Sequence, residues 1–261
     1  GLMREFDRGY SEVTFSKLAA LTGAREAIIH KEFHFSSCDP KLVGEHAVKK
    51  IGRTNYDVAD QLSNMGMEAI HPKAAKTLRQ ADVPLRVTNA FEPEDPGTLI
   101  DDRKAETPAV EIVTGLDIVA FELFEQDMVG VKGYDTAILD VLTRHNVRIV
   151  SKVSNANTIT HYLDASLKTM RRMEKDLAQI YPAAEITTKT LSMASVIGRD
   201  LNGLSVLQRG LVAIAEAGQT AIGASQGPRN VDVQFIVERE SLQPVIKALH
   251  GAFIEEEAAT P

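Results

Sequence analysis

A polar loop early in the chain combines the residue types that most often bind small molecules. Ala27-Ile-Ile29 is typical of a short strand, and the next residues, His30 to Pro40, include histidine, lysine and acidic side chains. In an α/β sheet, the loops that follow strands line the ligand crevice. Residues 30–40 are therefore predicted to border a ligand site.

Other chemistries are excluded by motif and by composition. The seven histidines show no zinc spacing, and the chain has no H-E-x-x-H, no G-x-G-x-x-G and no Walker loop. The single cysteine, Cys38, excludes an internal disulfide and a Cys-based zinc site, and it indicates a reducing cytoplasm. No metal site built by the protein alone is predicted.

Charge and hydropathy exclude two classes of partner. The net charge of −7 comes from 36 acids and 29 bases that interleave along the chain, aromatics are 5% and Trp is absent. Nucleic-acid binders usually cluster Lys and Arg beside stacking aromatics. No apolar run approaches the roughly 20 residues of a membrane-spanning helix. We expect a soluble protein without a nucleic-acid or membrane partner, and the loop-like start at Gly1 indicates a fragment.

Helical periodicity and cap residues organise the first 108 residues. Apolar residues repeat on one face from Ser11 to Leu21, and Gly23 ends that helix. Thr and Asp in Thr54-Asn-Tyr-Asp57 can cap a second helix, which Gly66 stops. The remaining predicted elements are a helix over 72–80, a strand over 83–88 and an acidic linker over 101–108 that marks a domain boundary.

The region after residue 108 contains an internal duplication. Each copy has the order β-α-β-β-α-β of a ferredoxin-like unit. The second copy lacks its last strand, and Val110–Val113 is predicted to supply it, which inserts the first unit in the second. The predicted strands are 118–124, 147–153, 158–163 and 185–189 in the first copy and 192–197, 220–224 and 231–237 in the second. In the first copy, one predicted helix ends at 142 and the other spans 165–180. In the second copy, one ends at 217 and the other spans 241–253.

Several motifs resemble the aspartokinase family over essentially the whole chain. The paired ferredoxin-like units are similar to the two ACT domains of that family. Within the family, the chain looks most like the branch associated with ectoine biosynthesis. The segments that carry these resemblances are Arg8-Gly-Tyr-Ser11, Glu26-Ala-Ile-Ile-His-Lys-Glu-Phe33, Cys38-Asp-Pro40, Arg53-Thr-Asn-Tyr-Asp-Val-Ala-Asp60, Gly66-Met-Glu-Ala-Ile-His-Pro72, Pro84-Leu-Arg-Val-Thr-Asn89 and Pro93-Glu-Asp-Pro-Gly-Thr-Leu-Ile100.

The resemblance implies an α/β fold and a phosphotransferase. Residues 1–108 would form the C-terminal part of the catalytic domain, residues 117–190 ACT domain 1, and residues 109–116 with 191–261 ACT domain 2. The implied enzyme transfers the γ-phosphoryl group of ATP, with Mg²⁺, to the side-chain carboxylate of L-aspartate in aspartate-family or ectoine biosynthesis. The family's K-F-G-G-T-S lysine does not occur in this sequence, so the isolated chain is expected to be inactive.

The family pattern also implies residues for the substrate side. Arg8 matches the arginine that pairs with aspartate, since a guanidinium can hold a carboxylate through two hydrogen bonds. Ser11 matches the serine of the R-G-G-S-D segment, and Glu12 stands where the family has Asp. Without the resemblance, Arg8 would be interpreted as a structural surface residue.

The nucleotide side departs from the family pattern. His30-Lys-Glu-Phe-His-Phe-Ser36 replaces T-D-V-D-G-V-Y, and Glu68 replaces a lysine. Lys31, Asp39 and Lys41 are the candidate residues on the ATP side, and ordinary solvated lysines are the alternative interpretation for the two cations. Either ATP is held differently, or catalysis is reduced.

An effector site is implied in the first ACT unit. Such units use the loop after their first strand and the start of the following helix, where free amides attract a carboxylate and glycines allow close approach. Here the facing strand is neutral or cationic where the family has acids, and Lys152 argues against lysine as effector; threonine, another ligand or no effector remain alternatives. The candidate effector residues are Met128, Gly130, Gly133, Tyr134, Asp135, Ser151, Asn155 and Asn157.

Two functional hypotheses follow from these features. The first is the C-terminal part of an aspartokinase that forms a homodimer through its ACT domains, because exposed edge strands commonly pair. The second is a stand-alone ACT module that senses an amino acid or only dimerises. They differ in whether the upstream reading frame contains K-F-G-G-T-S.

Overall fold

The computed structural model describes residues 9–67 and 70–255. The chain divides into two compact units. The first unit draws on residues 1–115, 194–235 and 243–261, and the second on residues 116–193 and 236–242. Within the described residues, no helix is long and apolar enough to cross a membrane.

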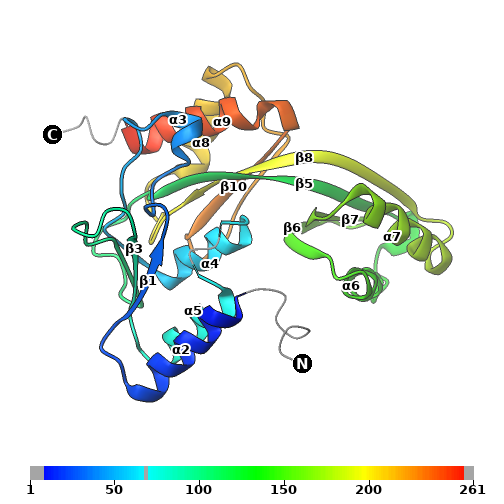
Figure 1. Cartoon of the computed structure of the whole chain (residues 1–261). Helices are drawn as coiled ribbons and strands as arrows, with labels where there is room; N and C mark the ends of the chain where they lie inside the picture. The colour runs from blue at the N-terminus through cyan, green and yellow to red at the C-terminus, as the bar shows by residue number, and fades with distance from the viewer. Residues whose placement is uncertain (1–8, 68–69, 256–261) are drawn as a thin grey trace. The chain divides into compact units, whose positions relative to one another are not determined.

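A four-stranded sheet forms part of the first unit (Figure 1). Strand β3 pairs in parallel with β1 and antiparallel with β4, which pairs in parallel with β2. Helices α4 and α5 are amphipathic, and α2 packs against α5. The elements are α2 (Tyr10–Thr22), β1 (Ala27–Lys31), α3 (Pro40–Val43), β2 (Arg53–Asn55), α4 (Tyr56–Asn64), α5 (Pro72–Gln80), β3 (Leu85–Asn89) and β4 (Thr98–Asp101).

The helices lie close to their predicted positions, and one cap differs. Gly23 ends α2 in the left-handed conformation, with φ 59°, which glycine adopts without a steric penalty. Helix α5 spans the predicted residues, with Pro72 in its first turn. The prediction that Thr54 and Asp57 cap α4 was wrong, because the Asn55 side chain accepts the hydrogen bond from the Val58 amide.

A six-stranded sheet has the order β6-β7-β5-β8-β10-β9. Strands β5 and β8 are long, and each has residues in both units. The remaining elements are β5 (Ile112–Phe124), α6 (Tyr134–Arg144), β6 (Arg148–Ser154), β7 (Thr158–Asp164), α7 (Leu167–Ile180), β8 (Glu185–Ile197), α8 (Val206–Glu216), β9 (Gly223–Gln226), β10 (Asp232–Val237) and α9 (Leu242–His250), with single turns at Gln126–Met128, Arg239–Ser241 and Gly251–Glu255.

This strand order is that of two ferredoxin-like units, the first inserted in the second, as predicted. Three strand assignments need correction. Val110–Val113 was predicted to form a strand separate from 118–124, but β5 runs without interruption from Ile112 to Phe124. Likewise, β8 joins the predicted strands 185–189 and 192–197. Strand β9 begins at Gly223, later than the predicted Thr220.

The second unit has its own apolar core. Phe121 and Leu123 of β5 and Leu163 of β7 contribute fully buried side chains. Helices α6 and α7 cover them with residues at helical spacing, including Ile138 and Met173. This packing fixes the start of α6 over strands β6 and β7, where several predicted effector residues lie.

Candidate functional site

A charged cluster joins the ends of three elements in the first unit. Glu12 lies in the first turn of α2, Lys31 ends β1, and His71 precedes α5. Glu12 Oε1 is 2.9 Å from Lys31 Nζ, and Glu12 Oε2 accepts a hydrogen bond of 2.5 Å from the His71 amide. About a fifth of each ion-pair side chain is exposed, so the pair is only partly screened by water.

This charged cluster has features of an anion-binding site. It sits at the carboxyl end of β1, the edge where α/β sheets bind ligands. Among the described residues, no side chain caps the start of α2, whose N-cap is Gly9, so the first amides of that helix can face an anion. Lys31 adds a positive charge that Glu12 neutralises in this arrangement.

The predicted substrate-side and nucleotide-side residues fall in different places. Glu12 and Lys31, which sequence reasoning assigned to different substrates, form one ion pair. Ser11 is exposed at the start of α2. Asp39 caps α3 by accepting a 2.9 Å hydrogen bond from the Lys41 amide. Among the described residues, Asp39 and Lys41 make no hydrogen bond to Glu12 or Lys31. The predictions for Arg8 and Glu68 lie outside the described residues.

A second cluster in the first unit was missed by sequence reasoning. Glu92 Oε2 lies 2.9 Å from His34 Nε2, and Lys50 Nζ lies 2.9 Å from Glu92 and 2.8 Å from Asp95. The hydrogen bonds from Lys50 lower the pKa of both carboxyl groups. Within the described chain, His34, Glu92 and Asp95 are the three side chains close enough to share a metal ion. The Lys50 ammonium already pairs with the carboxylates of Glu92 and Asp95, so it would have to be displaced before a metal ion could bind.

The loop before α6 borders a cavity of about 270 Å³ in the second unit. Six of the eight predicted effector residues line it. The prediction missed Val131 of the loop itself, and it missed Ser154, Ala156 and Ile159, which approach only when β6 and β7 fold against the loop. The six predicted lining residues are Met128, Gly130, Gly133, Tyr134, Asp135 and Asn155.

The other two predicted effector residues do not line this cavity. Ser151 lies in β6 opposite Tyr162 of β7. Asn157 forms a tight turn in which its amide donates to Asn155 Oδ1. The turn orients Asn155, whose side-chain oxygen also accepts from the Thr158 amide.

The polar wall of the cavity contains unmatched groups. Gly133 precedes α6 with φ 105°, and no side chain in the described part of the chain caps this helix, so its first amides are open to a ligand. Asp135 Oδ2 lies 2.5 Å from Lys152 Nζ, whereas its buried Oδ1 has no hydrogen-bond partner among the described residues.

A buried histidine lies behind this wall. His161 Nε2 is 3.6 Å from Asp135 Oδ1, the ring is completely buried, and neither ring nitrogen has a hydrogen-bond partner in the described part of the chain. Burial lowers the pKa of His161, Asp135 opposes that shift, and Lys152 adds to it. The ring of His161, with its lowered pKa, thus lies beside an ion pair. This arrangement depends on the pairing of β6 with β7 and was absent from the sequence pattern.

Comparison with known proteins gives this geometry a context. Residues 3–89 match the model of the amino acid kinase family. The chain is 54% identical over 259 residues to "Aspartate kinase Ask_Ect" of Stutzerimonas stutzeri, covering 98% of the chain and 54% of the relative. It is 25% identical over 257 residues to "Aspartokinase 3, chloroplastic" of Arabidopsis thaliana, covering 95% of the chain and 46% of the relative. The chain therefore spans about half the length of these relatives.

Solved structures share the fold. A Clostridium acetobutylicum aspartate kinase superposes with a TM-score of 0.85 at 19% identity, over 95% of this chain and 59% of that one. E. coli aspartokinase III, solved with lysine and aspartate, gives a TM-score of 0.78 at 20% identity, over 94% of this chain and 56% of that one. The comparisons confirm the resemblance to aspartokinases along nearly the whole chain, and the name of the Stutzerimonas relative supports the ectoine branch.

Proposed function

We propose that this chain is the C-terminal part of an aspartate kinase that transfers the ATP γ-phosphoryl group to the side-chain carboxylate of L-aspartate. The observation that carries the proposal is 54% identity, over nearly the whole chain, to an aspartate kinase. In the proposed organisation, residues 1–108 belong to the catalytic domain, residues 117–190 form ACT domain 1, and residues 109–116 with 191–261 form ACT domain 2. Mg²⁺ would enter with ATP, and the single thiol, Cys38, fits a cytoplasmic location.

The charged cluster supplies a physical role for the catalytic part. Phosphoryl transfer depends on positioned charges and helix termini more than on covalent chemistry by the protein. We assign Arg8, Ser11 and Glu12 to the aspartate side and Lys31, Asp39 and Lys41 to the ATP side. The 2.9 Å contact between Glu12 and Lys31 would link the two sides, because Glu12 fixes the position of the Lys31 ammonium.

Replacing Glu12 tests this assignment. In the full product of the reading frame that contains this chain, Glu12→Gln is expected to lower kcat/KM for aspartate by about 10- to 100-fold, since Lys31 loses its anionic partner. The free energy of unfolding should change by less than about 1 kcal/mol, as for other partly exposed ion pairs. Hydroxylamine trapping of the acyl phosphate measures the activity, and urea denaturation measures the stability.

A matched control exists in the same unit. Glu26 pairs with Arg86 at 2.7 Å with similar exposure, so Glu26→Gln also removes one carboxylate from an ion pair. It should leave kcat/KM within about twofold of the unmodified protein. Equal losses in both variants would contradict the role of Glu12, and lack of any ATP-dependent acyl phosphate from the unmodified full product would contradict the kinase proposal.

We also propose that the cavity beside α6 is an effector site and that the ACT domains form a homodimer. The uncapped α6 terminus suits a carboxylate. Lysine is disfavoured because Lys152 already occupies Asp135 Oδ2, the acid on the cavity wall that would meet a ligand ammonium. The alternative is a stand-alone ACT module without kinase activity.

Calorimetry separates lysine from other effectors. We expect no saturable heat when the 261-residue chain is titrated with lysine to millimolar concentration, whereas threonine, aspartate and ectoine test the remaining classes. Light scattering on the same sample measures the oligomeric state. Saturable lysine binding would contradict the argument from Lys152, and a monomer at all concentrations would contradict the homodimer.

A further inference from the structure

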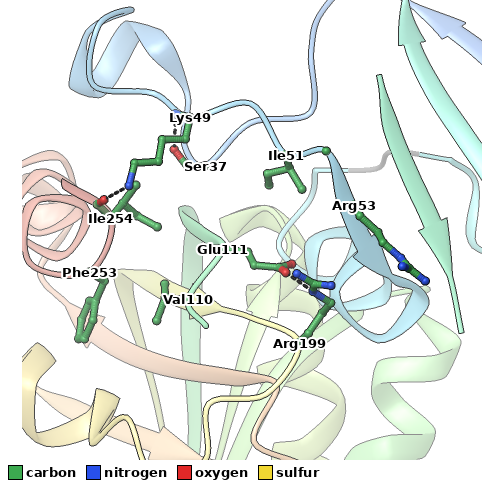
Figure 2. Close-up of a pocket in the computed structure, with 10 residues that line it drawn as sticks. Ser37, Lys49, Ile51, Arg53, Val110, Glu111, Arg199, Phe253 and Ile254 are labelled. Atoms are coloured by element: carbon green, nitrogen blue, oxygen red, sulfur yellow. Dashed lines mark hydrogen bonds and ion pairs between the residues drawn. The ribbon is translucent and has the colours of Figure 1, made fainter. Parts of the chain in front are cut away.

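The first unit contains a larger cavity than the one beside α6. Its volume is about 480 Å³, and its lining shares no residue with the cavity beside α6 or with the cluster around Glu12 (Figure 2). The lining comes from five separate stretches of sequence that meet within this one compact unit. These residues are Ser37, Lys49, Ile51, Gly52, Arg53, Val110, Glu111, Arg199, Phe253 and Ile254.

Two cations stand at separate ends of this cavity. Figure 2 shows Lys49 beside Ile254 at one end and Arg199 beside Glu111 at the other. Lys49 Nζ donates to the Ile254 carbonyl, and Arg199 Nε donates to Glu111. An ammonium has three donors and a guanidinium five. Each cation therefore keeps N–H groups that have no acceptor among the described residues.

The acids near the cavity are already engaged. Glu111 is the acidic side chain of the lining, only 7% of it is exposed, and it accepts hydrogen bonds from Arg199 and from Thr54. Arg53 also lines the cavity, but its guanidinium lies 2.7 Å from Asp101, outside the lining. The lining thus carries more positive than negative charge in a protein whose net charge is −7. Such a local excess favours an anion.

Apolar side chains occupy the middle of the cavity. Ile51 and Val110 lie between the two charged ends in Figure 2, and Phe253 lies beside Val110. A compact anion such as inorganic phosphate would reach one end and leave the apolar surface unfilled. A short aliphatic chain with a carboxylate at each end matches both the cations and the wall between them.

Ser37 has a structural role at this cavity and does not act as a nucleophile. Its Oγ lies 3.0 Å from His250 Nε2, and His250 Nδ1 lies 2.8 Å from Glu255. This order resembles a serine hydrolase triad. However, Ser37 is 1% exposed, and its Oγ accepts a hydrogen bond from the Lys49 amide, which leaves no open approach for an acyl group. The network instead holds Lys49 against the end of α9.

We propose that this cavity binds a small aliphatic dicarboxylate, with one carboxylate on Lys49 and the other on Arg199. The ligand would bridge the segment around Lys49, Arg199 after β8 and the turn after α9. Because these segments are far apart in sequence, binding should stabilise the unit by mass action. The inference is independent of the proposed kinase activity, since neither cation belongs to the cluster around Glu12.

The test is calorimetric titration of the 261-residue chain at constant low ionic strength. Succinate and glutarate are the dicarboxylate probes, butyrate has one carboxylate, and phosphate is the compact dianion. We expect saturable binding of at least one dicarboxylate, with butyrate and phosphate at least tenfold weaker. The same dicarboxylate should raise the thermal midpoint, whereas butyrate at equal concentration should not.

Two variants locate the site and one serves as control. Lys49→Gln should weaken the dicarboxylate at least tenfold, because one charge-assisted contact is lost. Arg199→Lys keeps a charge beside Glu111 but loses the second pair of N–H donors, and it provides an independent test if Lys49→Gln fails to fold. Lys168→Gln, an exposed lysine on α7, should bind like the unmodified chain.

Several results would overturn the proposal of dicarboxylate binding. The proposed site would be contradicted if neither dicarboxylate gave saturable heat up to about 10 mM. It would also be contradicted if Lys49→Gln and Arg199→Lys both bound with unchanged affinity. If phosphate bound more tightly than both dicarboxylates, the proposal that the ligand is an aliphatic dicarboxylate would be contradicted. A kinase-inactive full product that still binds the dicarboxylate would leave this inference standing and would contradict only the proposed function.

Discussion

Arg199→Met is expected to lower the free energy of unfolding by about 3–5 kcal/mol, the range for removing one partner of a buried ion pair. Glu111 is nearly inaccessible, and its carboxylate depends on Arg199 and Thr54 for stabilisation. Methionine fills much of the same volume but leaves the carboxylate without a cation. Urea denaturation at pH 7.5 measures the loss, with unchanged circular dichroism as evidence that the variant is folded.

A double variant separates charge from packing. Glu111→Gln together with Arg199→Met should recover much of the stability, because the unpaired buried charge is gone. A loss in the double variant as large as in Arg199→Met alone would show that the arginine acts through packing and not through its charge.

The same pair predicts a pH dependence. Burial raises the pKa of Glu111, while the hydrogen bond from Thr54 and the charge of Arg199 act in the opposite direction. A carboxyl group with a higher pKa in the folded state costs stability above that pKa, and the cost disappears as the pH falls through it toward the unfolded value. In Arg199→Met the opposing charge is lost. We therefore expect the variant to regain stability more steeply than the unmodified chain as the pH falls toward 4.5, the ordinary pKa of a glutamate.

His161→Leu should make the protein more stable in mild acid. Burial lowers the pKa of His161, so this side chain takes up a proton near its ordinary pKa of 6.5 in the unfolded chain and at a lower pH in the folded chain. Stability is then lost as the pH falls below 6.5, by up to about 1.4 kcal/mol per pH unit for one proton. Leucine removes that loss and also removes two buried nitrogens that have no partner among the described residues.

The measurement is urea denaturation at pH 5.0 and pH 7.5. We expect the variant to exceed the unmodified chain by about 1–2 kcal/mol at pH 5.0 and by less at pH 7.5. His46→Leu, at an exposed loop position, is the control and should follow the unmodified chain. Parallel stability profiles for His161→Leu and the unmodified chain would show that His161 is protonated in the folded state.

Much of the fold follows from local sequence signals. Helix α5 could be placed to the residue because Pro72 fits only its first turn, and Gly23 marked the end of α2 through its left-handed conformation. The duplication and its nested order followed from counting elements. Strand continuity did not, because whether 118–124 extends back to Ile112 depends on pairing with distant residues and leaves no local signal.

The candidate sites show the same difference between local sequence signals and contacts of distant residues. The glycine-rich segment before α6 was recognisable, and the structure places Met128, Gly130 and Gly133 around a cavity. The ion pair of Glu12 with Lys31 could not be inferred, since it depends on where the end of β1 meets the start of α2. The cavity with Lys49 and Arg199 has no motif at all, because its residues come from five unconnected stretches.

The nested strands have a consequence for synthesis on the ribosome. The Glu111 amide donates to the Ile197 carbonyl, so the first residues of the sheet region meet β8 only after β6, β7 and two helices have been made. At about 5–20 residues per second, the emerging end of β5 lacks its β8 neighbour for several seconds. The inserted unit can fold in that interval, and the enclosing unit must wait for it. Slow codons or a bound chaperone between residues 124 and 185 would act on this waiting period.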